Sequence, residues 1–207
     1  MAVKQKSLYS PHPGIAMVQK WIATLKEKTG RDLDAWLTLA KRHGPKSEAA
    51  RREWLKTKHG LGTNSAWWIA ERSFGRGHED DDPERYLEAA EGYVEAMLSG
   101  KKAALRPIYD ELVALCRGVG KDVKVSPGKT IVSVYRNHVI AQIKVASSSR
   151  IDFGLALGPT KPATMRLIDT GGLAKKDRIT HRFAIAKVEE IDAEVKRWLK
   201  TAYSRDA

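Results

Sequence analysis

The most distinctive short pattern with a possible chemical role is Gly60-Leu-Gly-Thr-Asn-Ser65, which lies between two amphipathic segments. Glycines permit a tight turn, and the amide N–H groups at the start of a following helix can bind a phosphate. Lysine side chains just before the turn would add positive charge. The pattern therefore predicts a contact with the phosphate backbone of a nucleic acid, formed by Lys56, Lys58, Gly60, Gly62, Thr63, Asn64 and Ser65.

Residues 55–69 resemble the helix-hairpin-helix motif of DNA-binding proteins. In that motif an apolar residue stands between two glycines, as in the Gly-Leu-Gly stretch of this chain, and the matching positions that follow are Ala66 and Ile69. Two positions depart from the motif. Lys58 stands where an apolar residue is usual, and His59 stands where a proline is frequent. A helix C-cap followed by an ordinary turn is the alternative interpretation of the same residues.

Charged residues also alternate with apolar ones in the C-terminal half. Strand parity in residues 139–145 and 150–157 puts most of the apolar side chains on one face and leaves polar and charged ones on the other. This face could bind a small ligand, a protein or a polyanion, or it could be the solvated outer face of an antiparallel sheet. The residues that could contribute to it are Lys129, Arg136, Lys144, Arg150, Asp152, His181 and Arg182.

The patterns that would indicate an enzyme are incomplete. Residues 126–130, SPGKT, end like a phosphate-binding loop, but Val123 stands where the first glycine is needed and a predicted strand follows. Asp122, Gln142 and Lys144 faintly resemble the Asp…(Glu/Gln)-x-Lys core of metal-dependent nucleases, with Gln in place of the usual Glu. The six histidines show no metal-ligand spacing. We expect no catalytic residue, metal or cofactor, and a degenerate metal-dependent nuclease is the alternative function.

The charge of the chain favours an anionic partner. Its formal net charge is +12 over 207 residues, with +9 in residues 1–78, −5 in residues 79–120 and +8 in residues 121–207. Two basic modules therefore flank an acidic segment. Such a balance favours polyanions, nucleic acid above all, because binding releases condensed counterions.

Composition indicates a cytoplasmic globular protein. Apolar residues make up 42% of the chain, charged residues make up 30%, and no apolar stretch approaches the length that a bilayer crossing requires. The first residues lack the apolar region of a secretory signal. The only cysteine, Cys116, excludes an intrachain disulfide. We therefore expect no membrane association.

The hydrophobic period changes along the chain from that of helices to that of strands. Period 3.6 predicts four helices before Gly75, the fourth capped by Thr63 or Asn64, and one of Trp67 and Trp68 should face outward or toward the second module. Helices at about 83–98 and 107–117 follow. Period 2 then predicts a sheet over about 122–186, before a terminal helix at about 188–203. The fold class is α+β: an all-helical module, 1–77, followed by an antiparallel sheet flanked by helices, 78–207.

The stretches TGRDLDAWLTLAKRHGP, WLKTKHGLGTNSAWWIA, GKKAALRPIYDELVALC and residues 126–157 resemble a bacterial two-module family of uncharacterised proteins. The resemblance covers nearly the whole chain, and both halves are domains of unknown function. The C-terminal half is similar to segments labelled predicted transport protein. Its order of strands and helices also looks like that of small cytoplasmic double-wing proteins suspected of binding DNA. The resemblance implies two modules and supplies no catalytic residue.

Overall fold

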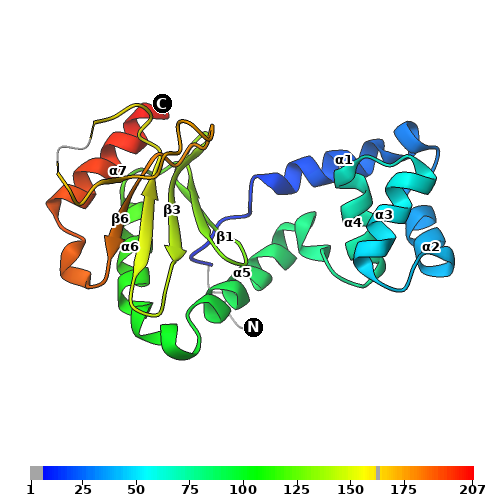
Figure 1. The fold of residues 1–207 in the computed structure, drawn as a ribbon, viewed down its shortest axis with the longest axis horizontal. Coiled ribbons are helices and arrows are strands. Elements are labelled where there is room, and N and C mark those ends of the chain that lie inside the picture. Colours follow the sequence, from blue (N-terminus) through cyan, green and yellow to red (C-terminus); the bar gives the residue numbers. More distant parts are fainter. Residues whose placement is uncertain (1–6, 162–163) are drawn as a thin grey trace, which may run out of the picture. The chain divides into compact units, whose positions relative to one another are not determined.

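The chain folds into two compact units in a computed structural model that describes residues 7–161 and 164–207. The helical unit comprises Pro11–Tyr86. The sheet unit comprises Leu87–Ala207 together with the described N-terminal residues 7–10. Figure 1 shows the elements of each unit along the chain. Each unit has a hydrophobic core of its own, so each is described by itself.

Four α-helices make up most of the helical unit. They are α1 (Gly14–Thr29), α2 (Leu33–His43), α3 (Glu48–His59) and α4 (Thr63–Ser73), followed by the 3₁₀ turn η1 (His78–Asp80). Asp32 and Ser47 cap α2 and α3 with side-chain oxygens, as short polar residues before helices do. The apolar faces of the four helices meet in a core of Leu25, Trp36, Ala40, Leu55, Leu61, Ala66, Ile69 and Ala70. The helical period of the sequence follows directly from this packing.

The sheet unit consists of helices and six antiparallel strands. The helices are α5 (Pro83–Met97), which begins in the helical unit, η2 (Gly100–Leu105), α6 (Arg106–Gly118), η3 (Val188–Glu190) and α7 (Ala193–Arg205). The strands are β1 (Lys124–Pro127), β2 (Val132–Tyr135), β3 (Val139–Val145), β4 (Ile151–Leu155), β5 (Ile168–Asp169) and β6 (His181–Ile185). They form one sheet in the order β1-β2-β3-β4-β6-β5.

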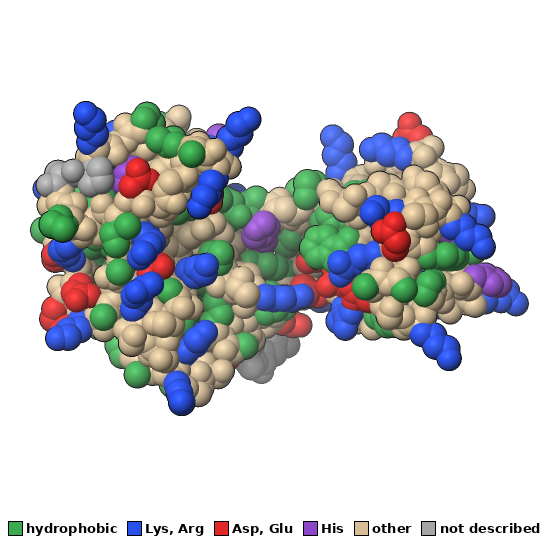
Figure 2. Space-filling view, viewed as in Figure 1, with side chains coloured by type: hydrophobic (Ala, Val, Ile, Leu, Met, Phe, Trp, Pro, Cys, Tyr) green, Lys and Arg blue, Asp and Glu red, His purple; other side chains and the backbone are tan. Residues whose placement is uncertain are grey.

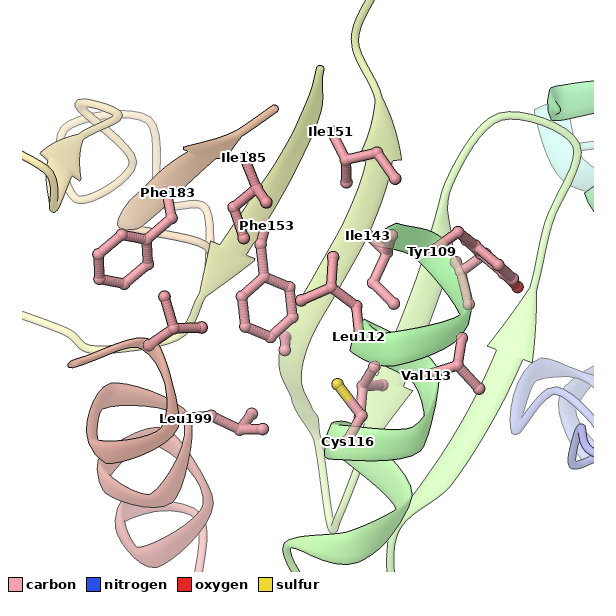
Figure 3. Packing of buried hydrophobic residues seen from close by; sticks show 14 of the residues in the cluster. Tyr109, Leu112, Val113, Cys116, Ile143, Ile151, Phe153, Phe183, Ile185 and Leu199 are labelled. Carbon is pink, nitrogen blue, oxygen red and sulfur yellow. The ribbon is translucent and has the colours of Figure 1, made fainter. Parts of the chain in front are cut away.

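The helices α6 and α7 cover one face of this sheet. Alternate residues of the strands, among them Ile143, Phe153 and Phe183, are buried in one cluster with Leu112 of α6 and Leu199 of α7. Figure 3 shows these side chains between the two helices and the strands. The opposite side chains of the same strands therefore form an outer face that these two helices do not cover.

The predicted α+β fold class is confirmed: helices precede a six-stranded antiparallel sheet, and a terminal helix packs on it. The terminal helix packs through Val195 and Leu199, which are fully buried, and Trp198, which is partly buried. Within the described part of the chain, no helix has the length and apolar character needed to cross a bilayer.

The two units divide the chain differently from the predicted modules 1–77 and 78–207. The division falls between Tyr86 and Leu87, inside α5, and residues 7–10 belong to the sheet unit. Hydrogen bonds explain why residues 7–10 belong to the sheet unit. The Ser10 amide donates to the Val125 carbonyl at 2.8 Å, and the Tyr9 hydroxyl lies 3.1 Å from that of Tyr109. The sheet unit is therefore discontinuous in sequence.

Candidate nucleic-acid interface

The predicted hairpin between α3 and α4 is present, and a left-handed glycine makes its first corner. Gly60 has φ +66°, a conformation that side chains with a Cβ adopt only with strain. Its amide donates to the carbonyls of Leu55 and Lys56, and the Leu61 amide donates to the Leu55 carbonyl at 3.2 Å. These two amides close the end of α3 and are not available to a phosphate. Gly60 therefore shapes the turn without itself offering a donor.

The second corner leaves the start of α4 open. Gly62 is the N-cap of α4, where Thr63 or Asn64 was predicted, and it provides no capping side chain. The first amides of a helix have no acceptor within the helix, and in α4 they belong to Thr63, Asn64 and Ser65. Gly62, Thr63 and Asn64 are exposed. Together with the positive end of the helix dipole, this arrangement suits an anion.

The Gly62 position has room for a side chain that the sequence does not place there. Its φ is −62°, so the backbone needs no glycine. A Cβ built on it would meet no atom within 4 Å. A serine or aspartate here would cap α4 better than glycine does. What glycine uniquely leaves is free space in front of the amides.

Buried contacts hold the hairpin in place. Leu61, Ala66 and Ile69 lie in the core of the helical unit. The Ser65 hydroxyl accepts a hydrogen bond from the Trp21 indole at 2.8 Å. Ser65 was predicted as a binding residue, and its hydroxyl, which accepts from Trp21, keeps its own O–H as a donor beside its backbone amide. The turn is thus a rigid part of the unit.

A groove of about 500 Å³ runs beside the hairpin, and we call it the hairpin groove. Trp67 is 42% exposed in it, whereas its neighbour Trp68 is 8% exposed and packs on Trp21 with ring centroids 4.8 Å apart. One tryptophan of the pair therefore faces outward, as the sequence predicted. The residues that line the groove are Ala49, Arg52, Glu53, Lys56, Thr63 and Trp67.

Two polar residues of the groove, Arg52 and Glu53, were not predicted from the sequence. The Arg52 guanidinium lies 5.7 Å from the centre of the Trp67 ring and also pairs with Glu48. Arg52 stands four residues before Lys56 on α3, a spacing that puts both on one helix face and could have indicated it. Lys56 pairs with Glu53 at 3.2 Å. The groove thus combines cations with an exposed aromatic face.

The predicted binding residue Lys58 and its neighbour His59, which was not predicted to bind, both lie outside the residues that line the groove. Lys58 is exposed but does not line the groove. His59, which stands where the motif often has proline, packs edge-on against Trp36 and Trp54, with centroids 5.6 Å and 4.4 Å away. Burial, and then the nearby charges of Arg31 and Lys58, lower the pKa of His59. Its neutral ring belongs to the packing of the helical unit.

Four of the predicted sheet-face residues lie together on the outer face. Lys144 is directly opposite Asp152 in the β3–β4 register, and Arg182 is opposite Gly154 in the β4–β6 register. The Asp152 Oδ1 atom accepts from Arg182 Nη1 and from Arg150 Nε, each at 3.0 Å. Figure 2 shows Lys and Arg side chains over the face of the sheet unit turned to the viewer, with Asp and Glu side chains among them.

Three predicted face residues lie elsewhere. His181 is 1% exposed and on the core side of β6, because it alternates with Arg182. Its Nε2 atom lies 2.9 Å from the Thr160 carbonyl oxygen. Lys129 is in the β1–β2 connection, with its ammonium 5.9 Å from the centre of the Tyr93 ring. Arg136 is in the β2–β3 hairpin, bonded to Asp122 at 2.8 Å.

The nuclease-like residues Asp122 and Lys144 have different partners in the structure. Asp122 lies just before β1 and accepts hydrogen bonds from Arg136 and from the Tyr203 hydroxyl. These bonds, that from Arg136 first, lower the pKa of Asp122. Lys144 is opposite Asp152 instead. Within residues 7–161 and 164–207, no three His, Cys, Asp or Glu side chains are grouped so that they could hold a metal ion.

Comparison with known families gives two matches. The family described as Domain of unknown function (DUF5655) matches residues 94–205, which lie in the sheet unit. The family described as Domain of unknown function (DUF4287) matches residues 17–72, which lie in the helical unit and include the hairpin. No curated protein and no solved structure matched the chain. The two matches confirm the predicted two-module composition of uncharacterised domains.

Proposed function

This chain belongs to the family described as Domain of unknown function (DUF5655), and we propose that it is a non-enzymatic protein that binds the phosphate backbone of nucleic acid through the α3–α4 hairpin of its helical unit. The single cysteine supports a reducing compartment, so we place the protein in the cytoplasm. A nucleic acid, as a polyanion, also suits the net charge of +12.

The observation that carries the proposal is the exposed, uncapped start of α4. The amides of Thr63 and Asn64 lie at the positive end of a helix, and Gly62 keeps the space before them empty. The hairpin groove adds the Lys56 ammonium, which Glu53 only partly neutralises at the surface. Contacts of amides and lysines with phosphates carry no base information, so binding is expected to be tolerant of sequence.

Trp67 extends the same surface beyond the phosphate. Its ring is 42% exposed in the groove, and aromatic faces of this kind stack on unpaired bases without strong base preference. A single-stranded segment or frayed end could therefore bind beside the hairpin more tightly than a closed duplex. This preference is part of the proposal, and a Trp67→Ala variant that lost affinity for single strands more than for duplex would support it.

The test is a substitution whose effects on folding and on binding have opposite signs. Gly62→Asp places a capping carboxylate on the α4 amides, so the helical unit should gain a few tenths of a kcal/mol in stability. The same carboxylate occupies the position of the phosphate and repels its negative charge, so affinity for DNA should fall by about tenfold. Fluorescence anisotropy with labelled duplex and single-stranded DNA measures the affinity, and thermal unfolding measures the stability.

Two matched variants separate occupancy of the amides from a change in net charge. Gly62→Asn caps the helix without charge and should also weaken binding. Gly92→Asp adds the same charge on the exposed side of α5, where an added Cβ meets nothing within 4 Å, and should weaken binding less. Lys56→Gln should lower the slope of log K against log salt by about 0.9. Equal binding by Gly62→Asp and Gly92→Asp would contradict a shaped phosphate site and leave only diffuse attraction.

A further inference from the structure

The outer face of the sheet contains a hollow of about 280 Å³, which we call the sheet-face hollow. The segment 170–180 crosses the face beside it. This segment is held by hydrogen bonds between Thr170 and Thr180 at 2.9 Å and between Thr180 and Leu155 at 3.1 Å. The hollow is lined by Gln142, Lys144, Asp152, Gly154, Thr170, Gly172, Lys175, Asp177, Ile179 and Arg182.

Gly154 allows this segment to lie close to the sheet, and Gly172 allows the segment to fold closely on itself. A Cβ on Gly154 would stand 2.6 Å from the Ile179 γ2 carbon, so Ile179 packs directly over the bare backbone of β4. A Cβ on Gly172 would stand 2.3 Å from the Ile179 carbonyl oxygen. Ile179 is only 8% exposed as a result. The wall of the hollow is therefore a packed part of the fold.

Three cations converge on the hollow, and two of them have no ion-pair partner in the described part of the chain. These two are Lys144 and Lys175, both exposed. Arg182 is fixed by its hydrogen bond to Asp152 at 3.0 Å, which leaves its other donors for a ligand. Asp152 is in turn neutralised by Arg182 and Arg150. The net positive charge of this site suits a compact anion.

Polar acceptors and donors stand beside the cations. One carboxylate oxygen of Asp177 accepts from the Ile179 amide at 3.0 Å, and the other remains able to accept from a hydroxyl. The Gln142 amide, half-buried on β3, offers both a donor and an acceptor. The carboxylate and carbonyl oxygens of these residues can accept from hydroxyl groups of a ligand but cannot bind a bare anion. The site therefore has an anionic part and a hydroxyl-binding part.

We propose that the sheet-face hollow binds a small phosphorylated polyol of the size of a sugar phosphate. Lys144, Lys175 and Arg182 hold the phosphate, Asp177 accepts hydrogen bonds from the hydroxyls, and Gln142 both donates to them and accepts from them. Ligand pockets usually measure about 300–1,000 Å³, so a hollow of 280 Å³ lies just below that range and suits a ligand no larger than one sugar ring with its phosphate. This site is separate from the hairpin of the helical unit and does not depend on it.

The test is a titration of the full chain, labelled with ¹⁵N, with ribose 5-phosphate, and with ribose and inorganic phosphate as separate arms. Ribose 5-phosphate should produce saturable shifts of the amides of Lys144, Asp152, Gly172 and Arg182 and should bind more tightly than either part alone. Lys144→Gln and Lys175→Gln should each weaken it by about three- to tenfold. Both lysines are exposed, so these variants should keep the fold.

Lys200→Gln, which removes the same charge from an exposed position on α7, is the matched control and should leave the affinity unchanged. The proposal is overturned if this control weakens binding as much as Lys144→Gln does, or if inorganic phosphate binds as tightly as ribose 5-phosphate. A duplex DNA that shifted the same amides and displaced the sugar phosphate would assign the face to nucleic acid and would also overturn it. Gly62→Asp should not affect this titration.

Discussion

His59 is one residue at which the helical unit should respond to pH. Its ring lies between Trp36 and Trp54, and its Nε2 atom is buried with no hydrogen-bond partner in the described part of the chain. A protonated ring would place a charged donor there without an acceptor. Burial, followed by the positive charges of Arg31 and Lys58, accordingly lowers the pKa of His59. The unfolded chain, by contrast, takes up the proton at the ordinary value of about 6.5.

We therefore predict that the helical unit loses stability as the pH falls below about 6.5, because only the unfolded state then binds this proton. Above that pH the contribution of His59 is fully present. His59→Phe, which keeps an aromatic ring and cannot titrate, should reduce the loss. Tryptophan fluorescence during thermal unfolding at about pH 7.5 and about pH 5 measures the effect. The control is His43→Gln at an exposed position, and a wild-type slope in His59→Phe would contradict the prediction.

The hairpin shows which site properties a sequence can predict at the scale of single residues. The Gly-Leu-Gly spacing was sufficient to predict a turn between helices, because the left-handed conformation of Gly60 is one that few other residues adopt. It did not show which glycine has positive φ, nor that the Ser65 hydroxyl binds Trp21. The hydrogen bond between Trp21 and Ser65 joins residues 44 positions apart. Partners so distant in the sequence leave no local pattern, whereas the i, i+4 spacing of Arg52 and Lys56 did leave one.

At the scale of elements, the end of α7 makes one close contact with the chain before β1. The Tyr203 hydroxyl donates to Asp122 at 2.8 Å, and the Arg136 guanidinium lies 4.4 Å from the centre of its ring. A Cβ on Gly120 would stand 2.4 Å from the Tyr203 ring. Gly120 is thus required for this contact by space, whatever its backbone conformation.

Gly120→Ala should therefore destabilise the sheet unit by about 1–3 kcal/mol, because the ring must move away from Asp122 and Arg136. Chemical denaturation followed by circular dichroism measures the loss. Gly118→Ala, two residues earlier at the end of α6, is the matched control, since its Cβ would meet nothing within 4 Å. It should leave stability unchanged or raise it by up to about 1 kcal/mol. Equal losses in the two variants would show that the Tyr203 contact is unimportant.

Hydrophobic periodicity predicted the elements better than it predicted the loops that complete the sites. The alternation of Ile151, Phe153, Leu155 and Leu157 correctly identified the core face of β4, because burial on one face imposes period 2. The same rule applied to β6 would have put His181 inward, opposite to Arg182. The segment 170–180 has no such period. Its place over the sheet is set by Gly154, Gly172 and Ile179, which meet only in the folded chain.

At the scale of the whole molecule, residues 7–10 should stabilise a unit whose remaining residues begin at Leu87. The Ser10 amide bonds to Val125, and the Ser126 hydroxyl donates to the Ser10 carbonyl at 3.0 Å. Removing residues 1–10 should destabilise the sheet unit by about 1 kcal/mol for each hydrogen bond lost and leave the unfolding of the helical unit unchanged. Fluorescence serves here because five of the six tryptophans lie in Pro11–Tyr86 and Trp198 alone lies in the sheet unit.

A chain that begins at Ser7 is the control for this truncation, because it keeps the Tyr9 and Ser10 contacts. Tyr9→Phe tests a smaller part of the same interaction, since it removes only the hydrogen bond to the Tyr109 hydroxyl. Its effect should lie between those of the control and the full truncation. If the chain beginning at Pro11 and the chain beginning at Ser7 unfold alike, residues 7–10 contribute nothing to the sheet unit.

Because the sheet unit is discontinuous in sequence, its parts leave the ribosome at different times during synthesis. All of Pro11–Tyr86 leaves the ribosome before any strand of the sheet does, and its core is complete without them. The helical unit can therefore fold while synthesis continues, as N-terminal domains generally do. Residues 7–10 are made before the helical unit, but their partners Val125 and Ser126 are made more than a hundred residues later. The oldest described part of the nascent chain is thus among the last to find its partners.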